Sequence, residues 1–175
     1  MPSLVLFRAA NVGGHGVFRP AQLAKELAGF GVRSVGAAGS FVVHERVRQA
    51  TLKAEIAQRV PFTPELVFCS AKDLRDLVAA DPMGARAAAT GARRFVTFLD
   101  GKPRHAPDLP LRMPDEKGWQ VEVGEVHGRA VVSVWRQVGK KLLYSNPVVE
   151  REFGRSGTTR NWSTVLKLHA LLDAR

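Results

Sequence analysis

The order of short apolar runs and helix-patterned segments in the first 70 residues most constrains the fold. Apolar runs typical of buried strands occupy residues 3–10, two stretches within 32–43, and 66–69. Segments with helical spacing lie at residues 21–28 and 45–60. The order strand, helix, strand, strand, helix, strand predicts an α+β chain whose first part is ferredoxin-like, with two helices covering one face of an antiparallel sheet.

A second, smaller α+β subdomain is predicted to follow, so we expect domains at 1–70 and 71–175. Ser70 is placed to cap a helix with Asp73 in its first turn. A strand is expected at 94–99, a proline-rich connector at 101–117, a hairpin from 119 to 138, and a helix at 147–153. The hairpin and the C-terminal helices would pack as one unit.

The charge and composition of the chain limit the classes of partner that it is expected to bind. The 175-residue chain carries a formal net charge of +10, yet its basic residues are spread along the sequence in nothing larger than pairs such as Arg93-Arg94. Dispersed charge favours weak, non-specific attraction to nucleic acid over sequence-specific binding. The sequence shows no apolar run of membrane-spanning length and no signal-peptide pattern, so we expect a cytoplasmic, basic protein without a membrane partner.

Metal and disulfide chemistry have little support in the sequence. Cys69 is the only cysteine, which rules out an intrachain disulfide and a cysteine metal cluster. It follows an apolar run and is expected to be buried. The five histidines show no His-x-x-x-His spacing. We expect no metal and no cofactor.

The segment 157–168 concentrates unusual side chains before a final amphipathic helix. Thr158, Thr159 or Asn161 could each cap that helix by accepting a first-turn N–H. A cation such as Arg160 near a helix N-terminus opposes the helix dipole, so it calls for a negative partner. That partner is either a protein carboxylate or a bound anion, and both interpretations stay open.

A glycine-rich loop follows the first strand. It contains Asn11, Gly13, Gly14 and His15, directly after Arg8 at the strand end. The order strand, glycine loop, helix is that of phosphate-binding loops, but the loop matches neither G-x-G-x-x-G nor the lysine-containing P-loop. The glycines could equally serve a tight turn.

These two segments resemble a known family. Its members read Leu-Arg-Gly-Ile-Asn-Val-Gly-Gly near the start, which residues 7–14 resemble. They read Thr-Thr-Arg-Asn-Trp-Asn-Thr-Val near the end, which residues 158–165 resemble. Residues 38–43 and 94–99 resemble two further strands of the family. The family is the domain of unknown function 1697. The resemblance implies an α+β protein of two small subdomains, the first ferredoxin-like, and it implies no activity.

Departures from the family pattern fall close to the first motif. Ala9 replaces a glycine, Ala37-Ala38 replaces a polar pair, and Ser40 replaces an asparagine. If those polar positions line a site in other members, the site of this chain is altered or less polar.

The leading hypothesis is a cytosolic binding protein with an anion or nucleotide site between the subdomains. Its predicted residues are Arg8, Asn11, Gly13, Gly14, His15, Thr158, Thr159, Arg160 and Asn161. Non-specific nucleic-acid binding is one alternative, although Phe7, Phe41 and Phe68 lie among apolar neighbours and are expected in the core, not on a base-stacking platform.

An enzyme of unassigned reaction type is the other alternative. Its candidate nucleophiles and bases are His15, Ser40, Cys69, His127 and His169. The oligomeric state stays open.

Overall fold

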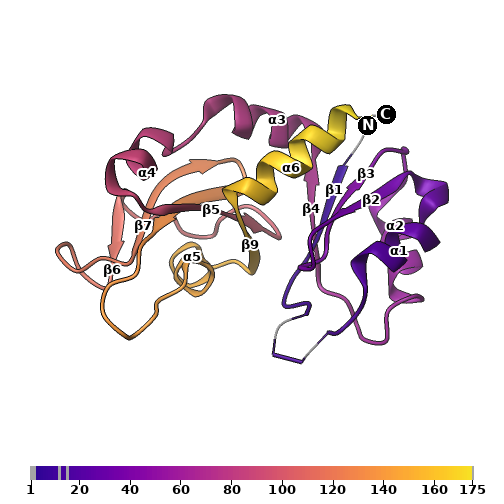
Figure 1. Ribbon diagram of the computed structural model, residues 1–175, viewed down its shortest axis with the longest axis horizontal. Helices are drawn as coiled ribbons and strands as arrows, with labels where there is room; N and C mark the ends of the chain where they lie inside the picture. The colour runs from indigo at the N-terminus through magenta and orange to yellow at the C-terminus, as the bar shows by residue number, and fades with distance from the viewer. Residues whose placement is uncertain (1–2, 12, 15, 175) are drawn as a thin grey trace. The chain divides into compact units, whose positions relative to one another are not determined.

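A computed structural model describes residues 3–11, 13–14 and 16–174 of the chain (Figure 1). It is a mixed α+β structure with two antiparallel sheets, as the sequence predicts. The chain divides into two compact units: residues 1–75 with 166–175 form the first unit, and residues 76–165 form the second. The expected domain boundary after residue 70 stays a prediction.

The first unit holds a four-stranded sheet and two main helices. In chain order these are β1 (Ser3–Phe7), α1 (Pro20–Glu26), β2 (Val32–Val35), β3 (Ser40–Val43), α2 (Gln49–Ala57) and β4 (Leu66–Ser70), with a short 3-10 turn at Ala28–Phe30. The strands lie in the order β2-β3-β1-β4, and every neighbouring pair is antiparallel. Strand β1 is therefore central, with Leu4 opposite Val42 on one side and opposite Cys69 on the other.

An aromatic core fills one face of this sheet. Alternate residues of the strands point to the same face, and Phe7 and Phe41 are 1% and 2% exposed. The Phe7 ring stacks on Phe18 with centroids 4.6 Å apart, and Phe62 meets Phe18 edge-on at 5.9 Å. Both helices contribute to this core, through residues Leu23, Leu27, Leu52 and Ile56, and Figure 1 shows α1 and α2 on the same side of the sheet.

The opposite face of the first sheet is buried as well. Leu4, Leu6 and Val42 lie on that face and have no exposed surface. Phe7 and Phe41 are core residues, as predicted, whereas Phe68 is only partly buried and packs against the edge of the same core. The described sheet therefore presents no exposed aromatic platform of the kind that stacks bases.

The second unit is built on a five-stranded sheet in the order β6-β7-β8-β5-β9. Its strands are β5 (Arg93–Leu99), β6 (Leu111–Met113), β7 (Val121–His127), β8 (Ala130–Trp135) and β9 (Gly157–Asn161), and its own helices are α4 (Gly84–Thr90) and α5 (Ser145–Phe153). Helices α3 (Ala71–Ala80) and α6 (Trp162–Asp173) each contribute residues to both units.

Helix α5 covers one face of the second sheet and α4 lies on the other (Figure 1). The α5 face carries an apolar core in which Val148, Val149 and Phe153 pack on the strands. Opposite them on the sheet stand Val121, Val123, Val131 and Leu99. This packing fixes the first turn of α5 beside the ends of β5 and β8.

Two strands were not predicted from the sequence. Strand β6 lies within the proline-rich connector 101–117, where it pairs with β7. Strand β9 occupies the segment expected to cap the last helix, and it pairs with β5. Both are short edge strands, whose pairing depends on a partner distant in sequence. The expected cap at Ser70 is confirmed, because its Oγ accepts the Asp73 N–H at 3.0 Å.

None of the helices in the described part of the chain has the length and apolar character needed to cross a membrane.

We predict that Gly39→Ala destabilises the first unit more than Gly36→Ala. Both glycines have positive φ, +69° and +64°, so both substitutions carry the left-handed backbone cost of about 1 kcal/mol. A Cβ on Gly39 would also lie 2.8 Å from the Phe7 Cβ, whereas one on Gly36 meets nothing within 4 Å. Overpacking against the fixed Phe7 ring should add about 1–3 kcal/mol.

Urea unfolding followed by far-UV circular dichroism measures both variants. Equal unfolding midpoints for the two would contradict the steric argument.

Candidate functional site

The Arg8 side chain has a carboxylate partner within the first unit. Its Nη1 lies 2.8 Å from Glu65 Oε2, and its backbone N–H donates to the Glu65 carbonyl at 2.9 Å. The cation at the end of β1 is therefore paired with a carboxylate of the protein itself. The carboxylate of Glu65 is 62% exposed, so this ion pair borders solvent.

The side chain of Asn11 holds its own loop together. Its Nδ2 donates to the Ala37 carbonyl at 2.7 Å, and its Oδ1 accepts the Phe18 N–H at 2.9 Å. Gly13 and Gly14 are exposed, with φ of +57° and +79°. His15 lies outside the described residues. These contacts give Asn11 a structural role in the loop.

Position 9 has a left-handed backbone. Ala9 is exposed and has a φ of +53°. Glycine adopts this region without the steric cost that a Cβ brings. Glycine would therefore be less strained than alanine at this position.

The C-terminal motif is a strand followed by a cap. Thr158, Thr159 and Arg160 lie in β9, so the two threonines do not cap the helix as two of the three predicted alternatives required. Asn161 is the cap, because its Oδ1 accepts the Thr164 N–H at 2.8 Å. The β-branched threonines favour an extended strand, and this strand pairs with β5.

Arg160 is buried within the second unit, with 7% of the residue exposed. Its Nη1 donates to Thr158 Oγ1 at 2.7 Å and to the Thr159 carbonyl at 2.9 Å. Burial lowers the pKa of its guanidinium to about 10. Because Arg160 precedes the cap and belongs to a strand, the helix-dipole argument for a bound anion does not apply to it.

The predicted site residues are thus divided between the units. Arg8, Asn11, Gly13 and Gly14 belong to the first, and residues 158–161 belong to the second. Their predicted grouping in one site stays a prediction.

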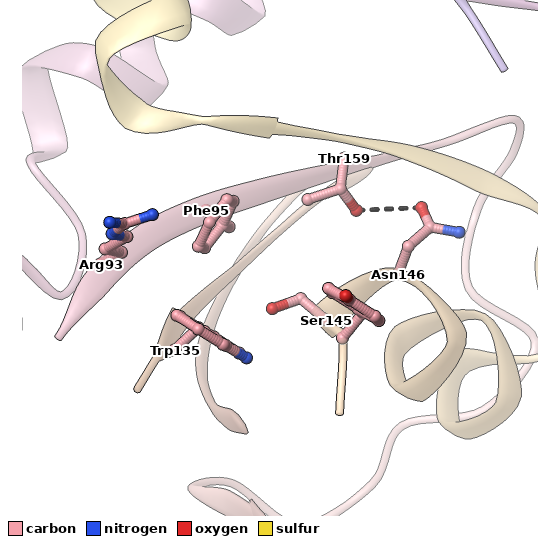
Figure 2. A pocket seen from close by; sticks show the side chains of 7 residues that line it. Arg93, Phe95, Trp135, Ser145, Asn146 and Thr159 are labelled. Atoms are coloured by element: carbon pink, nitrogen blue, oxygen red, sulfur yellow. Dashed lines mark hydrogen bonds between the residues drawn. The ribbon is translucent and has the colours of Figure 1, made fainter. Parts of the chain in front are cut away.

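The second unit contains a cavity of about 350 Å³ next to the start of α5. It is lined by Arg93, Phe95, Trp135, Tyr144, Ser145, Asn146 and Thr159. Figure 2 shows Arg93, Phe95 and Trp135 on one side, with Thr159 and Asn146 on the other. Of the sequence-predicted residues, Thr159 lines it.

The sheet register explains how these side chains meet. Arg93 and Phe95 share a face of β5 because strand side chains alternate, and Trp135 stands directly opposite Arg93 on β8. Thr159 is opposite Thr97 on the same face. The first turn of α5 closes the cavity with Ser145 and Asn146.

A chain of hydrogen bonds fixes the polar wall of the cavity. Thr159 Oγ1 donates to Asn146 Oδ1 at 2.9 Å and lies 2.7 Å from Thr97 Oγ1. Since a hydroxyl has one proton to donate, Thr97 is the donor in the second bond. The Trp135 indole N–H donates to the Leu143 carbonyl at 2.6 Å, which fixes the ring in the opposite wall.

The electrostatics of the cavity favour an anion. Arg93 is exposed at its rim, and the N-cap residue of α5, Tyr144, makes no side-chain cap hydrogen bond. The start of a helix carries partial positive charge and N–H donors that lack helical partners. The aromatic walls would cover the apolar part of the same ligand.

Most cavity residues were missed by the sequence analysis. The run Tyr144-Ser145-Asn146-Pro147 was a usable signal, because polar residues before a proline mark a helix start. Nothing local in the sequence indicated that Phe95 or Trp135 would line the same cavity.

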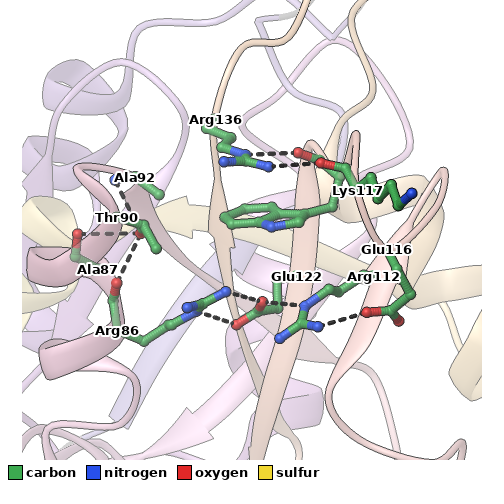
Figure 3. Close-up of polar contacts among 10 residues, drawn as sticks. Arg86, Ala87, Thr90, Ala92, Arg112, Glu116, Lys117, Glu122 and Arg136 are labelled. Atoms are coloured by element: carbon green, nitrogen blue, oxygen red, sulfur yellow. Dashed lines mark hydrogen bonds and ion pairs between the residues drawn. The ribbon is translucent and has the colours of Figure 1, made fainter.

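A second charged cluster lies on the other face of this sheet (Figure 3). The Glu122 side chain is 3% exposed and accepts from Arg86 Nε and Nη2 at 2.7 and 2.6 Å, and from Arg112 Nε at 2.7 Å. Burial alone raises the pKa of Glu122, but the hydrogen bonds from the two arginines outweigh it, and the net pKa is lowered. Because both of its carboxylate oxygens accept hydrogen bonds from arginines, we assign Glu122 a structural role.

The candidate catalytic residues give no complete arrangement among the described residues. Cys69 is buried, with its Sγ 3.5 Å from the Ser70 carbonyl, and Ser40 is fully buried. His127 Nε2 lies 3.1 Å from Glu125 Oε2. No group of three or more metal-ligating side chains occurs among residues 3–11, 13–14 and 16–174. Enzymatic activity stays an open alternative.

Comparison with known proteins identifies the family. A family described as "Protein of unknown function (DUF1697)" matches residues 1–128. The chain belongs to this family. The predicted resemblance is thereby confirmed, and the family description assigns no activity. No curated protein matches the sequence.

A solved structure shares the fold. The conserved bacterial protein SP0830 from Streptococcus pneumoniae is similar with a TM-score of 0.60 and 17% sequence identity, over 98% of each chain. At that identity the likeness concerns the fold alone.

We predict that Ala9→Gly stabilises the protein by about 0.5 kcal/mol. Relief of the left-handed Cβ clash, about 1 kcal/mol, exceeds the extra chain entropy that glycine loses on folding. Ala54→Gly, at an exposed position in the middle of helix α2, is the matched control and should cost about 1 kcal/mol. Opposite shifts of the urea midpoint are expected; a loss of stability in both variants would refute the argument.

We predict that Glu122→Gln destabilises the folded state by about 2 kcal/mol at neutral pH, because the charge-assisted hydrogen bonds are lost. The lowered pKa of Glu122 means that its ionised form favours folding. This contribution is present above the unfolded pKa of about 4.3 and is lost as pH falls through the folded value.

The difference in stability between wild type and variant should therefore be constant above about pH 5 and shrink on acidification. Glu116→Gln is the control, since Glu116 bonds the same Arg112 but is 70% exposed; it should change stability little. Equal losses in both variants would contradict the role of the buried carboxylate.

Proposed function

We propose that this protein binds a small anionic molecule of about nucleotide size in the cavity of its second unit. The observation that carries the proposal is the combination, in one cavity, of Arg93, three aromatic side chains and the start of α5. A volume of about 350 Å³ lies at the lower end of the range of small-molecule sites. It suits a ligand with one ring system and one charged group.

The anionic group of the ligand would bind Arg93, which lies on the same side of the cavity as Phe95 and Trp135, and the first turn of α5 faces it from the other side. The guanidinium offers paired N–H donors to a phosphate or carboxylate. The N–H groups of Ser145 and Asn146 point out of the helix start and add the dipole's partial positive charge. Asn146 is held by Thr159, so one side of the site is already ordered before a ligand binds.

The apolar part of the ligand would lie against Phe95 and Trp135. Their side chains are half-buried, so covering them with a ring removes apolar surface from water. Tyr144 is 58% exposed and can close over the ligand from the rim. The cavity thus combines aromatic surface with groups that favour an anion.

The site predicted from the two terminal motifs remains a separate proposal. Arg8 is already paired with Glu65, and Arg160 is buried beside Thr158 and the Thr159 carbonyl. We therefore rank it below the cavity of the second unit. Thr159 belongs to both proposals.

We also propose that the first unit is ferredoxin-like and that the protein is cytoplasmic. The strand order β2-β3-β1-β4 with antiparallel neighbours, and the alternation of its helices and strands, support the first statement. The second rests on the sequence pattern.

Thermal unfolding with and without ligand tests the binding proposal. The probes are inorganic phosphate and adenosine monophosphate, added to the full chain. A ligand at about 100 times its Kd should stabilise the folded state by about 2.7 kcal/mol, which raises Tm by about 5–10 °C. Arg93→Gln should remove most of this shift, and Arg46→Gln, an exposed arginine of the first unit, should retain it.

Adenosine monophosphate should act at lower concentration than phosphate, because it also covers the aromatic wall. A shift that persists in Arg93→Gln, or the absence of any shift with both probes, would overturn the proposal.

A further inference from the structure

We propose that the cavity of the second unit binds one nucleotide of a single-stranded nucleic acid, with adjacent phosphates lying along the loop 136–144. This inference rests on the proposed function, because it makes the anionic ligand in the cavity part of a strand. It adds a polymer partner and a second contact surface.

The loop 136–144 joins two walls of the cavity. It leaves β8 after Trp135 and ends at Tyr144, and both of these residues line the cavity. Any ligand extending past the rim on this side would meet the loop next. The loop is therefore continuous with the site.

Hydrogen bonds at both ends hold the loop in place. The Arg136 N–H donates to the Gln120 carbonyl at 2.9 Å, and the Leu143 N–H donates to Gln120 Oε1 at 3.0 Å. The Trp135 indole N–H donates to the Leu143 carbonyl at 2.6 Å. The middle of the loop is consequently displayed to solvent from fixed ends.

The displayed side chains are mainly basic or apolar, and none of them is acidic. Lys140 and Lys141 are exposed, and Val138 and Leu142 are 39% and 42% exposed. Within the described chain, no carboxylate forms an ion pair with Lys140, Lys141 or the rim residue Arg93. These three cations contrast with Arg86 and Arg112, whose charge is compensated by Glu122.

Aromatic rings beside uncompensated cations are the features by which proteins bind single strands. Bases of every kind stack on aromatic side chains, while lysine and arginine follow the phosphates. Phe95, Trp135 and Tyr144 supply the rings here, and the net charge of +10 adds long-range attraction. An acidic peptide would use the lysines but would leave the aromatic cavity empty.

Binding to a labelled single-stranded RNA of about 12 nucleotides tests the inference, measured by fluorescence anisotropy with the full chain at two salt concentrations. Tyr144→Ala should weaken binding about tenfold at both salts, because it removes a stacking ring. The double variant Lys140→Gln, Lys141→Gln should reduce the slope of log K against log salt by about 1.4, as expected for two phosphate contacts to a single strand.

The matched control is the double variant Arg46→Gln, Arg48→Gln, which removes two exposed cations of the first unit. Its salt slope should change less than that of the lysine variant. Equal changes in both double variants would show that overall charge alone drives binding and would overturn the inference. If polyglutamate displaces the labelled RNA as effectively as unlabelled RNA does, the inference is also overturned.

Small-molecule binding and nucleic-acid binding have different expected results in these experiments. Thermal stabilisation by adenosine monophosphate without tighter binding of the RNA would leave the small-molecule function standing and end the polymer inference. RNA binding lost in Tyr144→Ala, with the variant's circular dichroism unchanged, supports it.

Discussion

The backbone pairing of β9 with β5 is the contact on which the candidate site depends. It adds the edge strand to the second sheet, sets Thr159 beside Thr97 and brings the hydroxyl of Thr159 to Asn146 on α5. It also ends where Asn161 caps the following helix. Because successive strand side chains face opposite sides of a sheet, neighbouring residues of one motif serve different purposes. Thr159 lines the cavity, and Arg160 is buried on the other face.

The location of uncompensated charge matters more for function than the net charge does. Glu122 draws two arginines into an internal cluster, and Glu65 pairs with Arg8. Arg160 is directed at protein oxygen atoms, and its lowered pKa records the cost of burying a cation. Cations engaged in this way contribute less to attraction at the surface than exposed cations such as Arg93, Lys140 and Lys141, for which the described chain shows no ion pair.

The first unit uses its aromatic residues differently from the second. Phe7, Phe18, Phe41 and Phe62 pack on one another, and the strand residues among them are almost fully buried. In the second unit three aromatic side chains line the cavity instead. Phe95 and Trp135 are half-buried there, and Tyr144 is exposed. Exposure, not the number of aromatic residues, separates a core from a candidate binding surface.

The sequence alone determined the α+β class, most helix and strand positions, the cap at Ser70 and the family. These follow from periodicity, local capping chemistry and motif resemblance, all of which act over a few residues. For the last helix it offered Thr158, Thr159 and Asn161 as caps, and the structure selects Asn161 because the threonines are taken into β9.

Only the tertiary structure decided which residues line the cavity and whether each charged side chain is buried, paired or exposed. Arg93, Trp135, Asn146 and Thr159 come from four separate elements, and the register between β5, β8 and β9 places them on one face. No local pattern encodes that register, because edge-strand pairing and burial depend on segments distant in sequence. The same reason explains why Arg160 was expected at a helix terminus and lies buried in a strand.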